Sequence, residues 1–354
     1  MLDLERLFNT VKIEHVWIFF TDKCNLDCEY CFYRDRTNKQ TLPFGKLKVL
    51  LDKLSKHKYY CFVISGGEPL LEWDIVKKIV MYVKESFKHY ELILQTNGIF
   101  LDEPKVGFLK EYNVVVEHGI DGRFSTTSRY RIGTTKKIFN KIIDSIKLVV
   151  SKKLRVNPTI AVCPSEVSFI YKNFLYLVSL GLYSVDIHPA LLEPWKPYHI
   201  PIFKNQYLKI LEYERKSKRY LVCKDYHRPI SFGFDLVVMP DGNVLPNWVY
   251  LMLPKKLKEK FFFLKIEDNS IKVNEERLRF YLKSYHNFYR RPNPTYREFS
   301  NLNVQIMLKE WNNPIMSENF ENYRRLTAVL KKINQKAILL DKIEGRFRFE
   351  SKDG

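Results

Sequence analysis

The stretch CNLDCEYC, residues 24–31, places Cys24, Cys28 and Cys31 in the spacing Cys-x3-Cys-x2-Cys directly after an apolar run. Three thiolates on one loop can converge on three corners of a four-iron four-sulfur cubane, which leaves the last iron without a protein ligand. An open iron can bind a small molecule through nitrogen and oxygen, as a reductive cofactor site requires. The alternatives are a zinc site completed by a histidine and a chance grouping. Zinc sites usually repeat a Cys-x2-Cys pair, and this sequence has no second pair.

The composition around this stretch is that of a globular protein. With 354 residues and 45% apolar content, the chain has enough material for a core. Its 6 cysteines are too few for a disulfide scaffold, which favours metal chemistry. No run approaches the roughly 20 apolar residues of a membrane-spanning helix, and the N-terminus lacks the order of a signal peptide. We therefore expect a cytoplasmic protein with no membrane association.

The charge balance is strongly basic. Lysine and arginine total 59 against 40 acidic residues, a net charge of +19 that would suit an acidic partner such as RNA. The excess is spread along the chain without a single-sign block, so a solvated basic surface explains it more simply. A nucleic-acid partner stays open as a second interpretation.

Residues 1–200 alternate short β-rich runs with amphipathic helical stretches, which is typical of βα units. This α/β pattern favours a parallel sheet covered by helices, with functional loops at the carboxyl ends of the strands. The cysteines follow the first strand, and turns rich in glycine follow the later ones. The predicted strands are 16–21, 61–65, 91–96, 113–118, 155–162 and 183–188.

The alternation stops near residue 200. A helix is expected over 205–219, followed by a β-hairpin turning at Asp241-Gly242 and by a mostly helical remainder. We therefore expect a smaller C-terminal α+β extension on the core. The expected regions are a core domain at 1–200, a hairpin region at 201–270 and a helical extension at 271–354.

The cysteine stretch with its flank, CNLDCEYCFYR, resembles the cluster motif of the radical S-adenosylmethionine (SAM) superfamily. The resemblance implies that Cys24, Cys28 and Cys31 hold a [4Fe-4S] cluster, and that the fold is a curled, partial (βα)6 radical SAM barrel. In that family an aromatic residue commonly precedes the third cysteine and lies near the SAM adenine. Tyr30 is expected to make this contact, and a core or surface tyrosine is the alternative.

A second stretch, Ser65-Gly66-Gly67-Glu68-Pro69, resembles the GGEP motif that holds the methionyl amino group of SAM. The resemblance implies that Gly66, Gly67 and Glu68 contact SAM. Glycines let the backbone approach a ligand closely, and a carboxylate or a carbonyl is the natural partner of an ammonium. An isolated Gly-Gly turn would be an ordinary loop, but this one lies one βα unit after the cysteines.

Two weaker similarities follow along the chain. Thr96 and Asn97 belong to a Thr-Asn-Gly segment similar to the family's TNG, which implies a place in the SAM site. Asp121 belongs to an Ile-Asp-Gly segment similar to the family's Ser-Leu-Asp-Gly, in which Gly119 replaces the serine. Arg131 aligns with an arginine that can pair with the SAM carboxylate, a charge-assisted bond that suits guanidinium geometry. A solvated surface arginine is the alternative.

Three further residues are open to interpretation. His188 ends the last predicted strand, where its side chain could face the barrel mouth and the cofactor, although a structural histidine is an equal alternative. Cys163 ends the fifth predicted strand and could reach the same cavity. Cys61 begins an apolar strand and is expected to be a buried thiol.

The C-terminal third carries a partial resemblance. Cys223 and the segment VVMPDGNVLPNW resemble the start of a SPASM or twitch extension, which holds auxiliary iron–sulfur clusters in many peptide-modifying relatives. Asn247 stands where the next cysteine would be, so no auxiliary cluster is expected. Residues 272–297 interleave basic and aromatic residues, which could bind RNA or could form a packed amphipathic helix.

The resemblance implies an enzyme that cleaves SAM reductively, with flavodoxin or ferredoxin as electron donor, and abstracts hydrogen from a substrate. The hairpin favours a peptide or protein as substrate, in a maturase-like reaction. The basic charge favours RNA modification instead, and the start of the cluster motif at residue 24 leaves no room before it for a leader-binding domain. A catalytically silent binding protein is the third alternative.

Overall fold

The computed structural model of the chain describes residues 15–33, 39–217, 235–289 and 296–343, together with Leu4, Phe8 and Ile13. In this part of the chain, ten strands form one sheet in the order β12-β11-β10-β9-β1-β3-β4-β5-β7-β8, and β2 pairs with β6 separately. The strands are β1 His15–Phe19, β2 Asp27–Cys28, β3 Tyr59–Ser65, β4 His89–Thr96, β5 Val115–Gly119, β6 Arg131–Ile132, β7 Val156–Val162, β8 Asp186–Pro189, β9 Leu236–Val238, β10 Asn243–Leu245, β11 Leu264–Ile266 and β12 Ile271–Val273.

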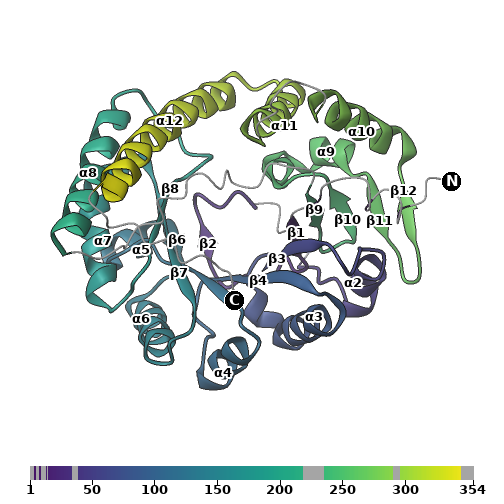
Figure 1. Ribbon diagram of the computed structural model, residues 1–354, viewed down its shortest axis with the longest axis horizontal. Helices are drawn as coiled ribbons and strands as arrows, with labels where there is room; N and C mark the ends of the chain where they lie inside the picture. Colours follow the sequence, from purple (N-terminus) through teal and green to yellow (C-terminus); the bar gives the residue numbers. More distant parts are fainter. Residues whose placement is uncertain are drawn as a thin grey trace.

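The strands predicted from the sequence are β1, β3, β4, β5, β7 and β8, which are neighbours in the sheet and run parallel. The α/β fold is therefore confirmed, with shifts of a few residues at some strand ends. β5 begins at Val115 rather than at residue 113, because Asn113 adopts a left-handed conformation with φ of 52° that turns the chain out of the preceding helix. The sheet curls into an incomplete ring with its helices outside (Figure 1).

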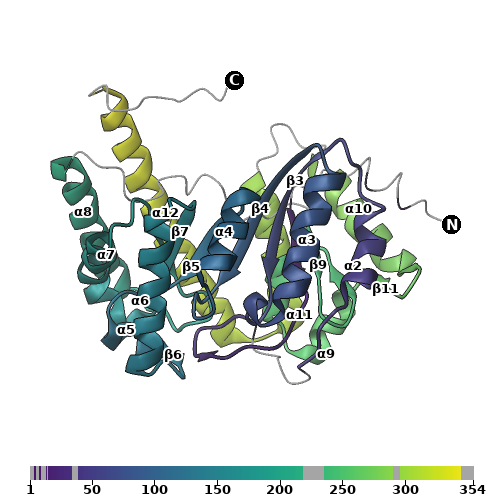
Figure 2. The ribbon, with the colours of Figure 1, turned by 90° about the horizontal axis from the view of Figure 1, so that it is seen from below.

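Helices α2, α3, α4 and α6 pack on the outer face of the sheet, side by side in both views (Figures 1 and 2). Their apolar stripes explain this position, since Leu47 and Leu50 of α2, Ile79 of α3, and Ile142 and Ile146 of α6 are fully buried. The α-helices are α2 Phe44–Leu51, α3 Trp73–Ser86, α4 Glu103–Glu111, α5 Phe124–Tyr130, α6 Lys136–Ser151, α7 Ile170–Ser179, α8 His199–Ser217, α9 Lys255–Lys258, α10 Glu275–Tyr289, α11 Tyr296–Trp311 and α12 Pro314–Ile343. Short 3-10 helices are η1 Pro69–Glu72, η2 Pro164–Phe169, η3 Trp248–Met252 and η4 Glu259–Phe261.

The inner face of the sheet is less buried than the outer face. Along β4, β5, β7 and β8, residues that point toward the helices are buried, and most of those that alternate with them are partly exposed. On β5, for example, Val116 and His118 are buried, whereas Glu117 between them is not. The inside of this partial barrel is therefore an accessible surface and not a core filled with side chains, as it is in a closed (βα)8 barrel.

The hairpin region continues the same sheet. β9 pairs in parallel with β1, and β10 and β11 then add antiparallel strands. The predicted turn at Asp241-Gly242 is present, and Gly242 has φ of +84°, with a Cβ position only 2.7 Å from Ile266 O. Both features require glycine at this turn.

The C-terminal helices close the ring on the side opposite α3 and α4 (Figure 1). α12 is joined to the segment before α8, where Asn322 Nδ2 donates to Trp195 O at 2.8 Å and Lys196 Nζ lies 3.0 Å from Glu318 Oε1. α8 begins earlier than the helix predicted over 205–219. None of the helices in the described part of the chain is long and apolar enough to cross a membrane.

Candidate active site

The cysteine loop follows β1, at the carboxyl ends of the parallel strands. Cys24, Cys28 and Cys31 are all partly buried, and the loop between them is shaped by a hydrogen bond of 3.1 Å from Cys31 N to Cys28 O. Cys28 lies in β2, which pairs antiparallel with β6, so that Cys28 is opposite Arg131. A hydrogen bond of 2.9 Å from Glu29 N to Tyr130 O extends the same pairing. The loop is thus held to a segment about a hundred residues further along the chain.

The Gly-Gly-Glu turn after β3 packs directly on this loop. Gly67 N donates to Thr21 O at 2.8 Å, and Glu68 N donates to Lys23 O at 2.7 Å. A Cβ atom on Gly67 would lie 2.2 Å from Lys23 O, and one on Gly66 would lie 2.6 Å from Thr21 O. Only glycine allows this approach, so the two sequence motifs form one structural unit.

The side chain of Glu68 is fully engaged by the protein. Its Oε1 accepts hydrogen bonds from Leu70 N at 3.0 Å and from Thr96 Oγ1 at 2.7 Å, and its Oε2 accepts one from Asn97 N at 2.8 Å. Burial raises the pKa of Glu68, while these three donors lower it. The Glu68 side chain therefore holds the turn after β4 against the turn after β3.

Thr96 and Asn97 are buried at this junction. Asn97 Nδ2 donates to Asn25 Oδ1 of the cysteine loop at 2.8 Å, and Asn97 Oδ1 accepts from Ile99 N at 3.1 Å. Asn25 was not identified from the sequence, because a residue between two cysteines carries no pattern of its own. The loops after β1, β3 and β4 are thus linked by hydrogen bonds.

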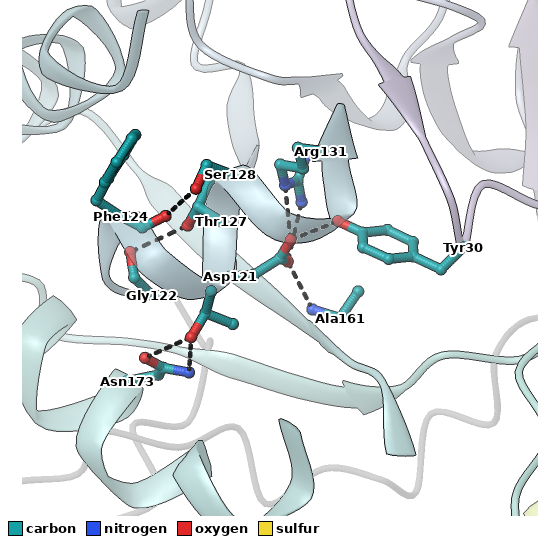
Figure 3. A network of polar contacts seen from close by, with 10 residues as sticks. Tyr30, Asp121, Gly122, Phe124, Thr127, Ser128, Arg131, Ala161 and Asn173 are labelled. Carbon is teal, nitrogen blue, oxygen red and sulfur yellow. Dashed lines mark hydrogen bonds and ion pairs between the residues drawn. The ribbon is translucent and has the colours of Figure 1, made fainter. Parts of the chain in front are cut away.

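Asp121 is the centre of a second network, shown in Figure 3. Its Oδ2 accepts from Tyr30 Oη at 2.7 Å and from Arg131 Nε at 2.9 Å, and its Oδ1 accepts from Arg131 Nη2 at 3.1 Å and from Ala161 N at 3.1 Å. Asp121 is fully buried and Arg131 nearly so. Burial raises the pKa of Tyr30 well above its ordinary value, so the phenol stays protonated and donates.

The position of Arg131 depends on Gly119. A Cβ atom at residue 119 would lie 2.8 Å from Arg131 Nη1. The serine expected from the family motif would therefore displace the guanidinium. The replacement of that serine by Gly119 and the bidentate pairing of Arg131 with Asp121 belong together.

Residues 18–166 match the family model described as the radical SAM superfamily.

The chain carries a radical SAM domain.

Two relatives show how far the similarity extends along this chain. The cysteine-type anaerobic sulfatase-maturating enzyme of Clostridium novyi is 33% identical over 150 residues, which are 39% of this chain and 40% of that enzyme. The GTP 3′,8-cyclase of Limosilactobacillus fermentum is 28% identical over 218 residues, which are 56% of this chain and 60% of the cyclase. The chain thus spans less than two thirds of the length of either enzyme.

A solved structure, anSMEcpe with bound AdoMet and Kp18Cys peptide, resembles this chain over most of its length. The TM-score is 0.64 at 17% identity, and the match covers 92% of this chain and 100% of that chain. At this identity the likeness shows the fold alone. It confirms the partial barrel fold expected from the sequence.

The cysteine loop of the radical SAM domain fits a [4Fe-4S] cluster. Within the described residues, no group of three or more His, Cys, Asp or Glu side chains is arranged to hold a single metal ion. A cubane cluster requires a different arrangement, since each thiolate binds its own iron. Burial raises the pKa of the Cys28 thiol to about 12, so its ionised form requires a cationic partner there.

The other predicted residues of the radical SAM domain take no part in the hydrogen bonds described above, although Tyr30 packs against the hydrophobic cluster that contains Cys163. His188 is partly exposed on the inner face of β8, with its Nε2 3.9 Å from Asp186 Oδ2. Cys61 is buried, as expected. Cys163 is also buried and packs with Tyr130 and Ala190.

In the hairpin region, Asn247 has a structural role. It is fully buried, and its Oδ1 accepts a hydrogen bond of 3.0 Å from Val249 N at the start of η3. At this position the SPASM pattern has a cysteine, whereas Asn247 caps the 3-10 helix η3 with its side-chain amide. Cys223 lies outside the described residues.

Proposed function

We propose that this chain is a radical SAM enzyme that cleaves SAM reductively and abstracts hydrogen from a peptide or protein. The single observation that carries the proposal is the linkage of the cysteine loop to the Gly-Gly-Glu turn through Gly67 and Glu68. The two motifs follow the neighbouring parallel strands β1 and β3, and these hydrogen bonds hold them in contact at the carboxyl ends of the strands. When bound, the cluster and SAM would supply an electron and a carbon-centred oxidant.

In this proposal each motif has a defined task. Cys24, Cys28 and Cys31 hold three irons, and the backbone carbonyls of Gly66 and Gly67 meet the ammonium of SAM. Glu68, Thr96 and Asn97 hold that backbone in place through the hydrogen bonds described above. The SAM site is thus built mainly by loops that hold one another.

The second network would fix the cluster loop and complete the SAM site. Asp121 binds Tyr30 of the cysteine loop and Arg131 at once, and the Arg131 guanidinium lies 5.6 Å from the centre of the tyrosine ring. We infer that the Tyr30 ring faces the SAM adenine, and that Arg131 presents its remaining N–H groups to the SAM carboxylate.

The fold favours a peptide substrate over RNA. The likeness to anSMEcpe, whose structure was solved with a peptide, extends over the C-terminal region as well as the core. Of the two alternatives for residues 272–297, burial supports the packed amphipathic helix, since Leu278 and Tyr281 of α10 are buried in the core. Residues 290–295 of that segment lie outside the described part of the chain.

The proposal includes flavodoxin or ferredoxin as electron donor and a cytoplasmic location.

The proposal is tested by anaerobic turnover with reductant and SAM, following 5′-deoxyadenosine. Fractions of a cell extract are added after treatment with protease or with ribonuclease. Stimulation lost with protease supports a polypeptide substrate. Stimulation that survives protease and disappears with ribonuclease would replace it by RNA modification, and failure of the reconstituted protein to bind iron or SAM would contradict enzymatic function.

A further inference from the structure

A row of polar side chains crosses the inner face of the sheet, beside the proposed SAM site. Ser65 Oγ donates to Gln95 Oε1 at 2.7 Å, and Gln95 Nε2 donates to Glu117 Oε2 at 2.7 Å. Gln95 is the register partner of Glu117, which in turn is the partner of Asn157. These residues come from four neighbouring strands, β3, β4, β5 and β7.

The row continues to β8, the last strand of the barrel. Asn157 Nδ2 donates to Asp186, and Asn157 Oδ1 accepts from Ser184 Oγ at 2.9 Å. His188 lies two residues beyond Asp186 on the same face of β8, at the 3.9 Å given above. The row therefore combines amide, hydroxyl, imidazole and carboxylate groups.

The amides orient the carboxylates and leave part of them free. Glu117 uses Oε2 for Gln95, and no described residue donates a hydrogen bond to its Oε1. Asp186 uses Oδ2 for Asn157 and faces His188 with the same oxygen. An acceptor that is positioned by one partner and open on the other side is suited to bind a donor from a ligand.

The charge of this face is opposite to that of the chain. Asp186 and Glu91 place negative charge near Glu117. His188 opposes their effect on the pKa of Glu117. Burial and these carboxylates raise the pKa of Glu117. Burial lowers the pKa of His188, but the adjacent Asp186 and Glu117 raise it overall. In a chain of net charge +19, a concave face that gathers carboxylates favours a cation over an anion such as phosphate.

The row of polar side chains is also accessible, and it lies close to the proposed SAM site. Gln95, Glu117, Asn157, Asp186 and His188 are partly exposed, whereas their strand neighbours on the outer face are buried. The strands that carry them lead directly into the Gly-Gly-Glu turn, the Thr-Asn-Gly turn and the Asp121 network. A substrate that reaches the SAM site from inside the barrel passes along this face.

We propose that Glu117 and Asp186, oriented by Gln95 and Asn157, bind a cationic group of the substrate. This inference rests on the proposed function and narrows its substrate class to a peptide with an ammonium or guanidinium near the reacting residue. A lysine or arginine side chain and a free peptide N-terminus share this chemistry. The experiment distinguishes between them.

The test uses synthetic pentapeptides, Ala-Ala-Xaa-Ala-Ala amide, with the reconstituted full chain and SAM under anaerobic conditions. Xaa is lysine, arginine, or one of the neutral counterparts norleucine and citrulline, each with a free or an acetylated N-terminus. We expect the charged acetylated peptides to bind about tenfold more tightly than the neutral ones, because a charge-assisted hydrogen bond contributes about 1.5 kcal/mol. A preference confined to free N-termini would assign the row to the peptide α-amine.

Two isosteric variants, Glu117→Gln and Asp186→Asn, remove charge and retain an acceptor for Gln95 and Asn157. Each should reduce the preference to about twofold or less, with iron content, SAM affinity and melting temperature unchanged. Glu103→Gln is the matched control, since Glu103 lies on α4 outside the barrel and pairs with Lys152, and the preference should persist in it.

The result that overturns the proposal is a wild-type protein with no preference for cationic peptides, or a preference that both row variants retain. Peptide binding is measured separately from iron content and SAM affinity. If the wild-type protein fails to bind iron or SAM, that result counts against the proposed function and not against the cation site.

Discussion

Tyr30 and Asp121 are 91 positions apart in the sequence, and the Tyr30 hydroxyl donates a hydrogen bond of 2.7 Å to Asp121 Oδ2. This contact joins the loop that carries the cysteines to the end of β5. It also places the phenol beside Arg131, which shares the same carboxylate. The contribution of this hydrogen bond to the anchoring of the cysteine loop can therefore be tested by removing the hydroxyl alone.

Removal of the phenol oxygen, in Tyr30→Phe, should lower the free energy of unfolding of the apo protein by about 1.5 kcal/mol, because it deletes a hydrogen bond to a buried carboxylate. The reconstituted variant should also lose iron faster than wild type to a chelator. Tyr59→Phe is the control, since Tyr59 is half exposed at the opposite end of the sheet. Equal iron-loss rates in wild type and Tyr30→Phe would show that this bond does not hold the loop.

Neutralising the centre of the network, in Asp121→Asn, should cost about 3 kcal/mol or more, because it leaves the buried Arg131 without a counter-charge. Urea unfolding of the apo protein measures this loss. The double variant Asp121→Asn with Arg131→Gln should recover part of it, as the unpaired charge is then gone. Additive losses in the double variant would contradict the direct pairing.

Restoring the family's serine, in Gly119→Ser, should destabilise the chain by about 1–3 kcal/mol, because the new Cβ would lie 2.8 Å from Arg131 Nη1. SAM affinity, measured by calorimetry, should fall as the guanidinium moves. Gly107→Ser is the matched control, since nothing lies within 4 Å of a Cβ at that helical position. A Gly119→Ser protein as stable as Gly107→Ser, with wild-type SAM affinity, would refute the coupling of Gly119 to Arg131.

Stability at acid pH should depend on His118. Burial lowers the pKa of this histidine to about 3, well below its usual value near 6.5. Between these values the unfolded chain binds a proton that the folded chain excludes, so the histidine contributes a loss of about 1.4 kcal/mol for each pH unit on acidification. Urea unfolding from pH 4 to 7 should show this slope in the difference between wild type and His118→Gln. The exposed His89→Gln is the control and should keep the wild-type slope.

Metal content provides a separate check on the cysteine loop. Anaerobically reconstituted protein should carry one cluster, near four irons per chain, and a variant with alanine at Cys24, Cys28 and Cys31 should carry none. Cys163→Ala, a buried cysteine outside the loop, should keep the full content. A content near eight irons would show a second cluster and would contradict the structural role of Asn247.

The fold could be predicted from the sequence because its signals are local. The β-rich runs and apolar helical stripes are short-range patterns, and each of the six predicted strands is present within a few residues of its expected position. The strand ends were less predictable. At Asn113, a left-handed backbone conformation set by the preceding helix delays the strand, and no propensity contains that information.

The site was only partly predictable, because motifs give positions and not partners. The cysteines, the Gly-Gly-Glu turn and Asp121 could be singled out, yet the engagement of both Glu68 oxygens depends on a turn 28 residues away. Ala161 N and Asn25 contribute as a backbone donor and a small amide, which leave no trace in sequence. Glu117, in contrast, is visible in the sequence as a carboxylate within an apolar strand. The alternating pattern of that strand places it on the inner face.

Asp121 makes hydrogen bonds to residues that are far apart in the sequence, and this affects when the network can form during synthesis of the chain. Its partners are Tyr30, near the start of the chain, and Ala161 N on β7. A ribosome releases the chain from its N-terminus at roughly 10 residues per second, so the cysteines emerge on the order of ten seconds before the network around Asp121 can close. During translation the loop passes through a period in which its thiols are exposed and unanchored. The anchored form of the cysteine loop therefore exists only after β7 has been synthesised.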